Sequence, residues 1–154
     1  MTDMEQLRQL YRDTVLKHSR SPRNFRRIEA PQACADGHNP LCGDKITVYL
    51  HLDHETIDDA TFEATGCAIS LASASMLTDM VAGQTAAAAM ALANDVQIML
   101  AGKSVPQCDF GELNALSGVR AYPSRVRCAA LPWRTLEAAL TGTGRTATTE
   151  PKEP

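Results

Sequence analysis

The sequence predicts one domain that combines helices with an antiparallel pair of β-strands. Two neighbouring segments, 45–52 and 57–65, alternate apolar and polar side chains, a pattern typical of half-buried strands. Apolar residues recur at helical spacing before and after them. Of the 154 residues, 44% are hydrophobic and 21% are charged, the balance of an ordinary globular protein. We expect a single domain over residues 1–141 and a disordered tail over 142–154, which is mostly Thr, Gly, Pro and charge.

Gly and Pro residues separate the expected helices. The first helix covers residues 4–20 and follows a capping box formed by Thr2 and Glu5. A loop rich in Pro, Gly, Asn and Asp extends from it through Pro40. The remaining helices are expected at about 68–82, 85–101, 111–116 and 123–140, the last one interrupted at Pro132.

Charge and hydropathy exclude two classes of function. The net charge of -3 argues against nucleic-acid binding, which requires a basic face toward the phosphates. The longest apolar run, residues 86–93, is mostly alanine and far shorter than a membrane span. The first ten residues are acidic where a secretory signal would be basic and then apolar. We therefore expect a cytoplasmic protein that binds neither nucleic acid nor a membrane.

Cysteines are the chemically distinctive residues of the chain, at positions Cys34, Cys42, Cys67, Cys108 and Cys128. An odd number cannot pair completely within one chain, and a reducing compartment does not favour a disulfide framework. Cys42, Cys67 and Cys128 stand where one expected element ends and another begins, so their side chains can meet. Spacing alone leaves a second interpretation open, in which they are inert buried thiols.

Asp44 adds a carboxylate to these thiols, two residues after Cys42. Gly43 between them lets the backbone bend so that both side chains can converge. Cys67 follows Gly66 at a junction of strand and helix, where the free N–H groups of a helix start favour a thiolate. Three thiolates and a carboxylate suit a tetrahedral zinc ion or one edge of an iron–sulfur cluster. Because a carboxylate is a weak partner in a soft site, the set favours release or exchange of what it holds.

Basic residues accompany the third cysteine and the first helix. Arg125 and Arg127 precede Cys128 and are expected to steady a thiolate or a persulfide there. A second basic set is either a solvated face or a docking patch for an acidic partner: Lys17, Arg20, Arg23, Arg26 and Arg27.

The other candidate residues receive less specific predictions. Cys34 and Cys108 match no motif and are expected not to be ligands. Tyr11 lies on the apolar stripe of the first helix and is expected in the core or at an interface. The histidines are expected at the surface or in turns, with the one nearest the site, His38, at most an occasional ligand: His18, His38, His51 and His54.

Three local motifs resemble the U-type iron–sulfur assembly family of IscU and the NifU N-terminal part. They are Asn39-Pro40-Leu41-Cys42-Gly43-Asp44, Gly66-Cys67-Ala68-Ile69-Ser70 and Arg125-Val126-Arg127-Cys128-Ala129-Ala130-Leu131. The resemblance covers nearly the whole folded part. It implies an α+β fold, a small antiparallel β-sheet of three strands with helices packed on one face. The third strand then lies near 28–33 or in the segment that leads to Cys42.

Within this family the chain is more similar to the SufU branch than to the scaffold branch. The stretch between Cys67 and Cys128 is longer than in the scaffolds, so residues 107–119 resemble the SufU insertion. The Leu-Pro-Pro-Val-Lys segment of the scaffolds is absent, and Arg127 replaces their histidine. The SufU branch implies a zinc protein that accepts persulfide sulfur from a cysteine desulfurase, SufS-like, and passes it toward downstream cluster-assembly proteins.

Two functions remain open on the ligand set Cys42, Asp44, Cys67 and Cys128. With Zn²⁺ bound, the chain is a sulfurtransferase that takes sulfur by thiol exchange. Cys42 is then the expected acceptor, because it sits in the flexible Gly turn beside the weak ligand Asp44, and Cys128 is the second choice. Alternatively, the same ligands assemble and transfer a [2Fe–2S] cluster, and the chain is a non-catalytic scaffold. A purely structural zinc domain is a third interpretation, against which the mixed ligand set argues.

Overall fold

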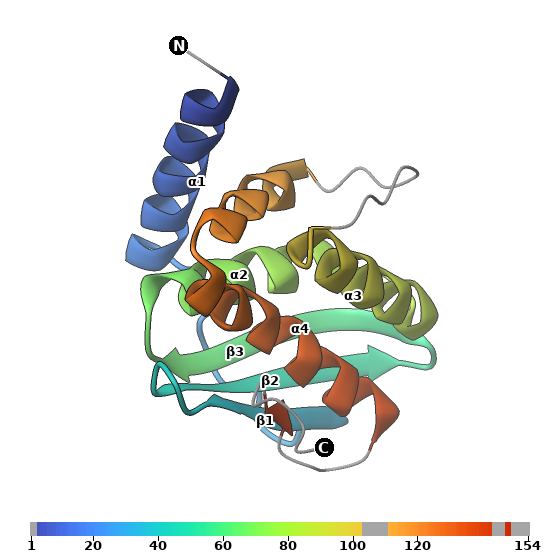
Figure 1. Ribbon diagram of the computed structural model, residues 1–154. Helices are drawn as coiled ribbons and strands as arrows, with labels where there is room; N and C mark the ends of the chain where they lie inside the picture. The colour runs from blue at the N-terminus through green and yellow to red at the C-terminus, as the bar shows by residue number, and fades with distance from the viewer. Residues whose placement is uncertain (1–2, 103–110, 143–146, 149–154) are drawn as a thin grey trace, which may run out of the picture.

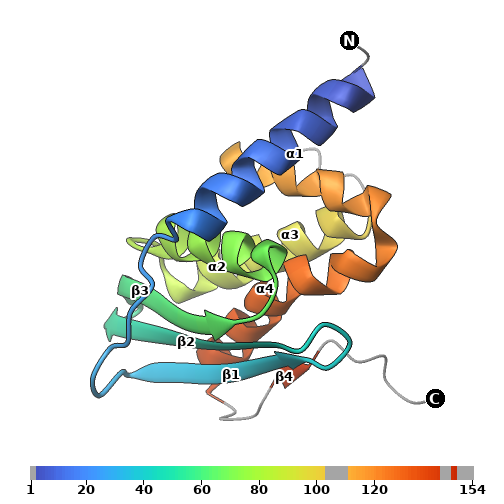
Figure 2. The same cartoon turned by 90° about the vertical axis from the view of Figure 1, so that its left-hand side faces the viewer.

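The computed structural model describes residues 3–102, 111–142 and 147–148, so the predictions for Thr2 and Cys108 lie outside the described residues. Figure 1 and Figure 2 show two layers, a β-sheet with the helices on one of its faces. This arrangement confirms the expected α+β fold. The elements are α1 (Asp3–Arg20), β1 (Ala33–Asn39), β2 (Asp44–Asp53), β3 (Thr56–Thr65), α2 (Ala68–Val81), α3 (Ala86–Leu100), the 3₁₀ helices η1 (Gly111–Ala121) and η2 (Pro123–Arg125), α4 (Val126–Thr141) and β4 (Ala147–Thr148).

Three antiparallel strands form the main sheet. β2 lies between β1 and β3, with Val48 opposite Ala35 on one side and Phe62 on the other. The predicted hairpin corresponds to β2 and β3 to within one residue at each end. The third strand, β1, lies in the segment that leads to Cys42, which is one of the two predicted positions.

A fourth, two-residue strand extends this sheet at the β1 edge. Ala147–Thr148 pair in parallel with Gly37 and His38. These two residues belong to the segment 142–154, for which a disordered tail stays a prediction. The free backbone groups along the edge of β1 offer hydrogen bonds to an extended segment, whatever its side chains. The domain boundary near residue 141 stays a prediction.

The hydrophobic core lies between the sheet and the helices. Val48, Leu50 and Phe62 of the sheet and Trp133 and Leu136 of α4 are all 0% exposed. Full burial of a side chain of this kind contributes about 1.5–3 kcal/mol. Since α4 packs against β1 and β2, this core fixes the helix that carries Cys128.

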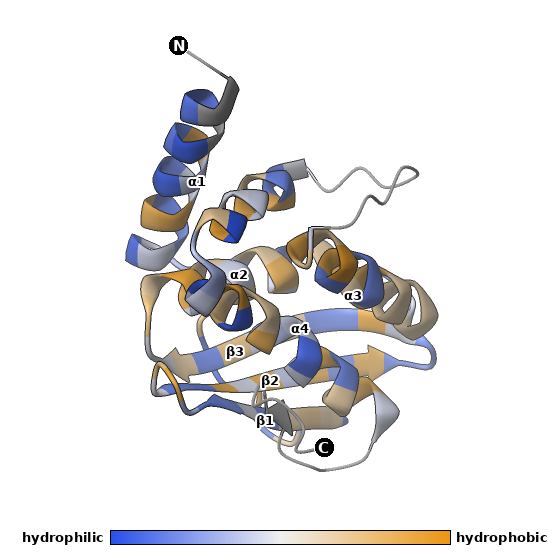
Figure 3. Cartoon of the chain, viewed as in Figure 1, coloured by the Kyte–Doolittle hydropathy of each residue, from blue (hydrophilic) through white to orange (hydrophobic). Residues whose placement is uncertain are grey.

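Hydropathy differs strongly among the helices. In Figure 3, α1 is mainly blue and hydrophilic, whereas α3 is mainly orange. α1 packs on α2 and η1 through a narrow face that includes Tyr11, Thr14 and Val15, so the prediction of a core position for Tyr11 is confirmed. No helix in the described ranges has both the length and the apolar character that crossing a membrane requires.

Two helix predictions near the C-terminus need correction. Pro132 does not interrupt the last helix, because α4 continues through it from Val126 to Thr141. Proline cannot donate to the carbonyl four residues earlier, but its neighbours Leu131 and Trp133 are completely buried, and this packing outweighs the lost bond. The short helix expected over 111–116 is the longer 3₁₀ helix η1.

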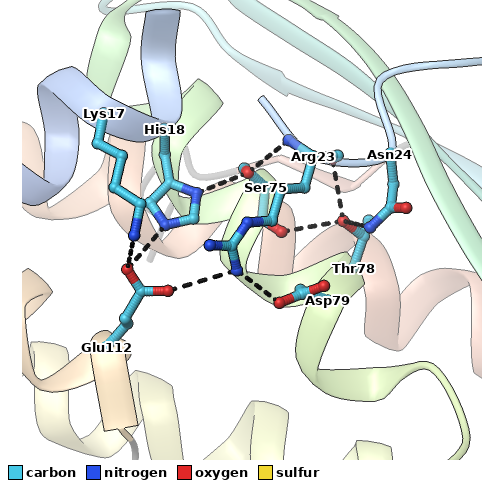
Figure 4. Close-up of polar contacts among 8 residues, drawn as sticks. All are labelled: Lys17, His18, Arg23, Asn24, Ser75, Thr78, Asp79 and Glu112. Carbon is cyan, nitrogen blue, oxygen red and sulfur yellow. Dashed lines mark hydrogen bonds and ion pairs between the residues drawn. The ribbon is translucent and has the colours of Figure 1, made fainter. Parts of the chain in front are cut away.

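A polar cluster joins α1, α2 and η1, and Figure 4 shows its members. Glu112 is at its centre. Its Oε2 accepts from Lys17 Nζ at 2.9 Å and lies 3.1 Å from His18 Nε2, and its Oε1 accepts from Arg23 Nη1 at 3.5 Å. The hydrogen bond from Lys17 lowers the pKa of Glu112, with a further contribution from His18. We call this set the Glu112 cluster: Lys17, His18, Arg23, Asn24, Ser75, Thr78, Asp79 and Glu112.

The prediction of a surface position for His18 is wrong, because its imidazole side chain is 1% exposed. Its Nδ1 lies 2.7 Å from Ser75 Oγ, which also accepts from the backbone N–H of Arg23 at 2.8 Å. His18 is on the same helical face as the buried Thr14 and Val15. A buried polar side chain needs partners, and those of His18 come from segments far along the chain.

Three of the five residues in the basic set form ion pairs within the chain, and a role of the set as a docking patch stays a prediction. Lys17 and Arg23 pair with Glu112, and Arg23 also lies 2.7 Å from an oxygen of Asp79. Arg26 contacts Asp59 of β3 at 2.8 Å. These cations therefore serve contacts within the chain.

Candidate metal centre

Four elements bring the candidate ligands to one end of the sheet. Cys42 lies in the turn between β1 and β2, and Asp44 is the first residue of β2. Cys67 is the N-cap of α2 and is separated from the end of β3 by Gly66 alone. Cys128 occupies the first turn of α4. Residues that are up to 86 positions apart in the chain thus become neighbours.

Three of the four candidates form one compact group. The ligand atoms of Cys42, Asp44 and Cys128 all lie within 4.8 Å of one another, and the two sulfur atoms are 3.0 Å apart. Cys67 stands beside this group, with its Sγ 3.7 Å from Asp44 Oδ2. The structure therefore places all four predicted residues together, with Cys67 joined to the group through Asp44.

Asp44 is a completely buried carboxylate. Its Oδ1 accepts the backbone N–H of Cys67 at 2.7 Å, so the carboxylate links the start of β2 to the start of α2. Gly66 makes this possible, because a Cβ at that position would lie 2.2 Å from Asp44 Oδ1, and its φ of +140° suits glycine. Burying an ionised carboxylate is costly unless it is hydrogen-bonded or coordinates a metal.

The thiols at this site do not ionise alike. Interaction with Cys128 lowers the pKa of Cys67 to about 7, against the effect of burial, and the backbone N–H groups of Ser70 and Ile69 at the start of α2 help. The pKa of Cys128 is raised far above its ordinary range, first by Cys67 and then by burial. Of these two thiols, Cys67 therefore loses its proton first, and a thiol that coordinates a cation must be deprotonated.

The two predicted arginines differ in position. Arg125 is exposed at the rim, and its Nη1 lies 3.5 Å from Cys42 Sγ. Arg127 is half-buried, and no hydrogen bond joins it to a thiol within the described part of the chain. The structure thus brings Arg125 to the site and leaves Arg127 beside it.

Hydrogen bonds connect the helices that carry Cys67 and Cys128. Ser73 of α2 donates to the carbonyl of Ala129 at 2.6 Å and accepts from Trp133 Nε1 at 3.1 Å. All of these groups are buried. These two bonds therefore join α2 to α4 behind the two thiols.

Several buried polar atoms around the site have no hydrogen-bond partner among the residues that the structure describes. They are the Tyr11 hydroxyl, Asn39 Oδ1 and Ser70 Oγ. Asn39 was not predicted to be functional, although it belongs to the first cysteine motif. Its amide nitrogen lies 3.4 Å from Cys128 Sγ and 3.5 Å from Asp44 Oδ2. Its place in that motif, directly before the turn of Cys42, was the signal that could have found it.

The remaining candidates lie outside the group. Cys34 is exposed in β1, and His38 is half-buried near the end of that strand. His51 contacts Asp58, and His54 is largely exposed in the hairpin turn. None of these four is a member of the candidate metal-binding group among the described residues.

The donor set fits a tetrahedral metal ion. Zinc bonds of about 2.0–2.3 Å place neighbouring ligand atoms about 3.3–3.8 Å apart. The 3.7 Å between Cys67 Sγ and Asp44 Oδ2 lies within this range, whereas the 3.0 Å between the sulfur atoms of Cys42 and Cys128 is shorter, so these two thiols would have to separate slightly to hold zinc. Sulfur ligands with one carboxylate could hold zinc or iron, and this geometry does not choose between them.

Known proteins are similar to this chain in sequence and in overall structure. Residues 10–129 match the family model of the NifU-like N-terminal domain. A Bacillus subtilis protein named zinc-dependent sulfurtransferase SufU is 38% identical over 129 residues, which cover 83% of this chain and 87% of that protein. A Streptococcus pyogenes protein named iron–sulfur cluster assembly scaffold protein IscU is 36% identical over 138 residues, with 89% and 86% covered. The crystal structure of FiSufU from Fervidobacterium islandicum AW-1 has a TM-score of 0.81 and 33% identity, and covers 86% of this chain and 97% of that one.

Proposed function

Because this chain belongs to the U-type iron–sulfur cluster assembly family, which the NifU-like N-terminal domain defines, we propose that it is a zinc-bound sulfur acceptor of SufU type. It takes sulfur from the persulfide of a SufS-like cysteine desulfurase and passes it to downstream cluster-assembly proteins. The observation that carries this proposal is the group of two thiols and a buried carboxylate, Cys42, Cys128 and Asp44. The Bacillus relative named zinc-dependent sulfurtransferase supports the choice of zinc. Its place of action is the cytoplasm, where thiols stay reduced.

The proposed zinc ligands are Cys42, Asp44, Cys67 and Cys128. Zinc, when bound, keeps its thiol ligands deprotonated at neutral pH. Three thiolates, one carboxylate and the ion have a formal charge of about -2. Arg125 and Arg127 are proposed to offset part of this charge, and Arg125 is already 3.5 Å from Cys42 Sγ.

The transfer step is a thiol exchange at Cys42. Its thiolate attacks the outer sulfur of the desulfurase persulfide, and a new S–S bond forms on Cys42. The S–S bond of the desulfurase breaks, and its electron pair leaves with the desulfurase cysteine as a thiolate. No net oxidation occurs, because one S–S bond replaces another. The proton on the transferred sulfur moves with it from the desulfurase to Cys42. The exposed guanidinium of Arg125 can move with the negatively charged sulfur on Cys42 and stabilise its charge.

Accessibility favours Cys42 over Cys128 as the acceptor, and backbone freedom favours it over Cys67. Cys42 is partly exposed, whereas Cys128 is completely buried. Gly43, with a φ of +70°, gives the turn of Cys42 a backbone that glycine adopts easily. Cys67 is held at the start of α2 by the bond from its own N–H to Asp44. Release of Cys42 therefore disturbs the fold least.

The test measures sulfide release by the desulfurase together with the site of the added sulfur. Cys42→Ser should abolish the stimulation, since a serine hydroxyl cannot carry a persulfide. Cys34→Ser, at an exposed thiol of β1, is the matched control and should leave stimulation unchanged. Peptide mass spectrometry should place the extra sulfur on Cys42. Sulfur on Cys128, with turnover intact in Cys42→Ser, would show that the wrong thiol has been chosen.

A scaffold that assembles and transfers a [2Fe–2S] cluster is the second candidate. The relative named IscU favours it, because that protein is nearly as similar to this chain as the SufU relative. Metal analysis and the visible spectrum of protein purified without air separate the two. Colourless protein with one zinc per chain supports the acceptor. Brown protein with iron and sulfide supports the scaffold.

A further inference from the structure

Asn39 touches every member of the Cys42–Asp44–Cys128 group. Its backbone carbonyl accepts from the N–H of Cys42 at 3.3 Å. Its side-chain Nδ2 donates to Asp44 Oδ2 at 3.5 Å and to Cys128 Sγ at 3.4 Å. The residue is completely buried at the end of β1. One side chain thus connects two of the candidate ligands, and its main chain shapes the turn of the third.

The amide of Asn39 is oriented toward the site by hydrogen-bond chemistry. Its nitrogen carries two hydrogens, and the neighbours on that side are a carboxylate and a sulfur, which both accept. Its oxygen has no partner within the described ranges. A buried asparagine that only supported the fold would normally have both ends paired. The two donated bonds therefore point to a role at the ligands.

The three ligand atoms of the group receive different donors. Cys128 and Asp44 face the neutral, buried amide of Asn39, which cannot move away. Cys42 Sγ faces the thiol of Cys128 at 3.0 Å, whose proton is lost when a metal binds, and the guanidinium of Arg125 at 3.5 Å, which is exposed and long enough to swing into solvent. A hydrogen bond to a thiolate withdraws charge from the sulfur and makes it a weaker nucleophile. Cys128 is thereby protected, and Cys42 is left reactive.

We propose that Asn39 is a positioning residue that retains Cys128 and Asp44 on the metal and leaves Cys42 as the exchangeable ligand. This inference rests on the proposed function, because it concerns the choice of the acceptor thiol. Asn39 touches neither the desulfurase nor the transferred sulfur in this scheme. It acts through the two ligands to which it donates.

Two substitutions test the donated bonds. Asn39→Ala removes them, and Asn39→Asp keeps the size of the side chain but replaces the donor by an acceptor. We expect the Zn²⁺ affinity, measured by competition with a chromophoric chelator, to fall about 10–100-fold in each, as is usual when a group that orients metal ligands is lost. Asn94→Asp changes the net charge equally at an exposed position of α3 and should leave the affinity unchanged. An affinity within twofold of wild type in both Asn39 variants overturns the proposal.

Two spectroscopic measurements separate positioning from general structural support. In Co²⁺-loaded protein, loss of the bond to Cys128 should move the sulfur-to-cobalt charge-transfer band to longer wavelength. In wild-type protein loaded with ¹¹³Cd²⁺, NMR should detect coupling between ¹¹³Cd and the Asn39 side-chain N–H through Cys128. This second measurement needs no variant, so it decides even if both variants fail to fold. Absence of the coupling overturns the proposal.

Mapping of the persulfide distinguishes failure of this inference from failure of the proposed function. The positioning role predicts that Asn39→Ala directs part of the added sulfur to Cys128, while wild type carries it on Cys42. If Asn39→Ala still carries it on Cys42 alone, the protection of Cys128 is wrong and the acceptor function stands. If wild type accepts no sulfur, the proposed function fails. The Zn²⁺ affinity of the Asn39 variants and the ¹¹³Cd coupling then still test the positioning role of Asn39.

Discussion

The Glu112 cluster and the metal centre are both polar, and both join elements that are distant in sequence. In the Glu112 cluster the acids and bases are matched, since Glu112 meets Lys17, His18 and Arg23. In the metal centre two thiols lie 3.0 Å apart next to a buried carboxylate. Polar atoms around this second set have no partner within the described residues.

The difference between these regions distinguishes polar groups that stabilise the fold from polar groups that can bind a ligand. A matched set stabilises the packing of helices and needs nothing further. A set of acids becomes strongly anionic when its protons leave, and it is then stable only with a cation. The Glu112 cluster therefore serves the fold, whereas the thiols and carboxylate of the candidate metal centre could hold a cation.

Zinc removal should change the stability of the folded protein most, and it should act on the metal centre without affecting the Glu112 cluster. A ligand at a thousandfold excess over its Kd stabilises the folded state by about 4.1 kcal/mol. Chelation should lower the Tm of the zinc-loaded protein, and calorimetry measures the change. An unchanged Tm after verified zinc removal would contradict the assignment of a ligand-dependent site.

Gly66→Ala should disrupt the metal centre by displacing Asp44. The new Cβ would lie 2.2 Å from Asp44 Oδ1, and the φ of +140° disfavours alanine. We expect a loss of about 1–3 kcal/mol in the free energy of unfolding from strain alone. Zinc affinity should fall as well, since Asp44 must move. Gly83→Ala, at a positive φ where no atom lies within 4 Å of the new Cβ, is the control for strain without the clash.

A pair of acid-to-amide substitutions sharpens the comparison directly. Glu112→Gln should lower the free energy of unfolding by about 1 kcal/mol, because the side chain is 40% exposed and water screens its ion pairs. The zinc affinity of the Glu112→Gln variant should stay at the wild-type value. Asp44→Asn should instead weaken zinc binding and change the stability of the metal-free protein little. If both variants change both quantities, the two regions are not independent.

The Glu112 contribution should also depend on pH. Its pKa is lowered in the folded state, so the stabilisation is present above the unfolded pKa of about 4.3 and is lost as pH falls through the folded value. The difference in Tm between wild type and Glu112→Gln should therefore shrink on acidification below about pH 4. A constant difference would show that the carboxylate charge is not what stabilises the cluster.

The smallest effect concerns the thiols of metal-free protein. With its pKa lowered to about 7, Cys67 should be alkylated by iodoacetamide at pH 8, and its rate should fall about tenfold per pH unit below 7. Buried Cys128, whose pKa is raised, should react far more slowly. Mass spectrometry of the modified peptides measures both rates. Faster alkylation of Cys128 would reverse the order of ionisation.

The sequence by itself determined the hairpin, most of the helices and the candidate ligands. The hairpin of β2 and β3 follows from alternation, and α2 and α3 follow from helical periodicity and the glycines that end them, because these are local properties of the chain. The motifs around Cys42, Cys67 and Cys128 are also local. They were sufficient to predict the family, the fold and the residues that the structure brings together.

Only the tertiary structure decided which polar side chains find hydrogen-bond partners and whether the last helix continues through its proline. His18 is buried because Ser75 and Glu112 reach it from α2 and η1. Asn39 became a candidate because β1 places its amide beside Cys128 of α4. Pro132 stays within a helix because its neighbours fill the core. In each case the deciding partner is distant in sequence, and its contact exists only after the chain has folded.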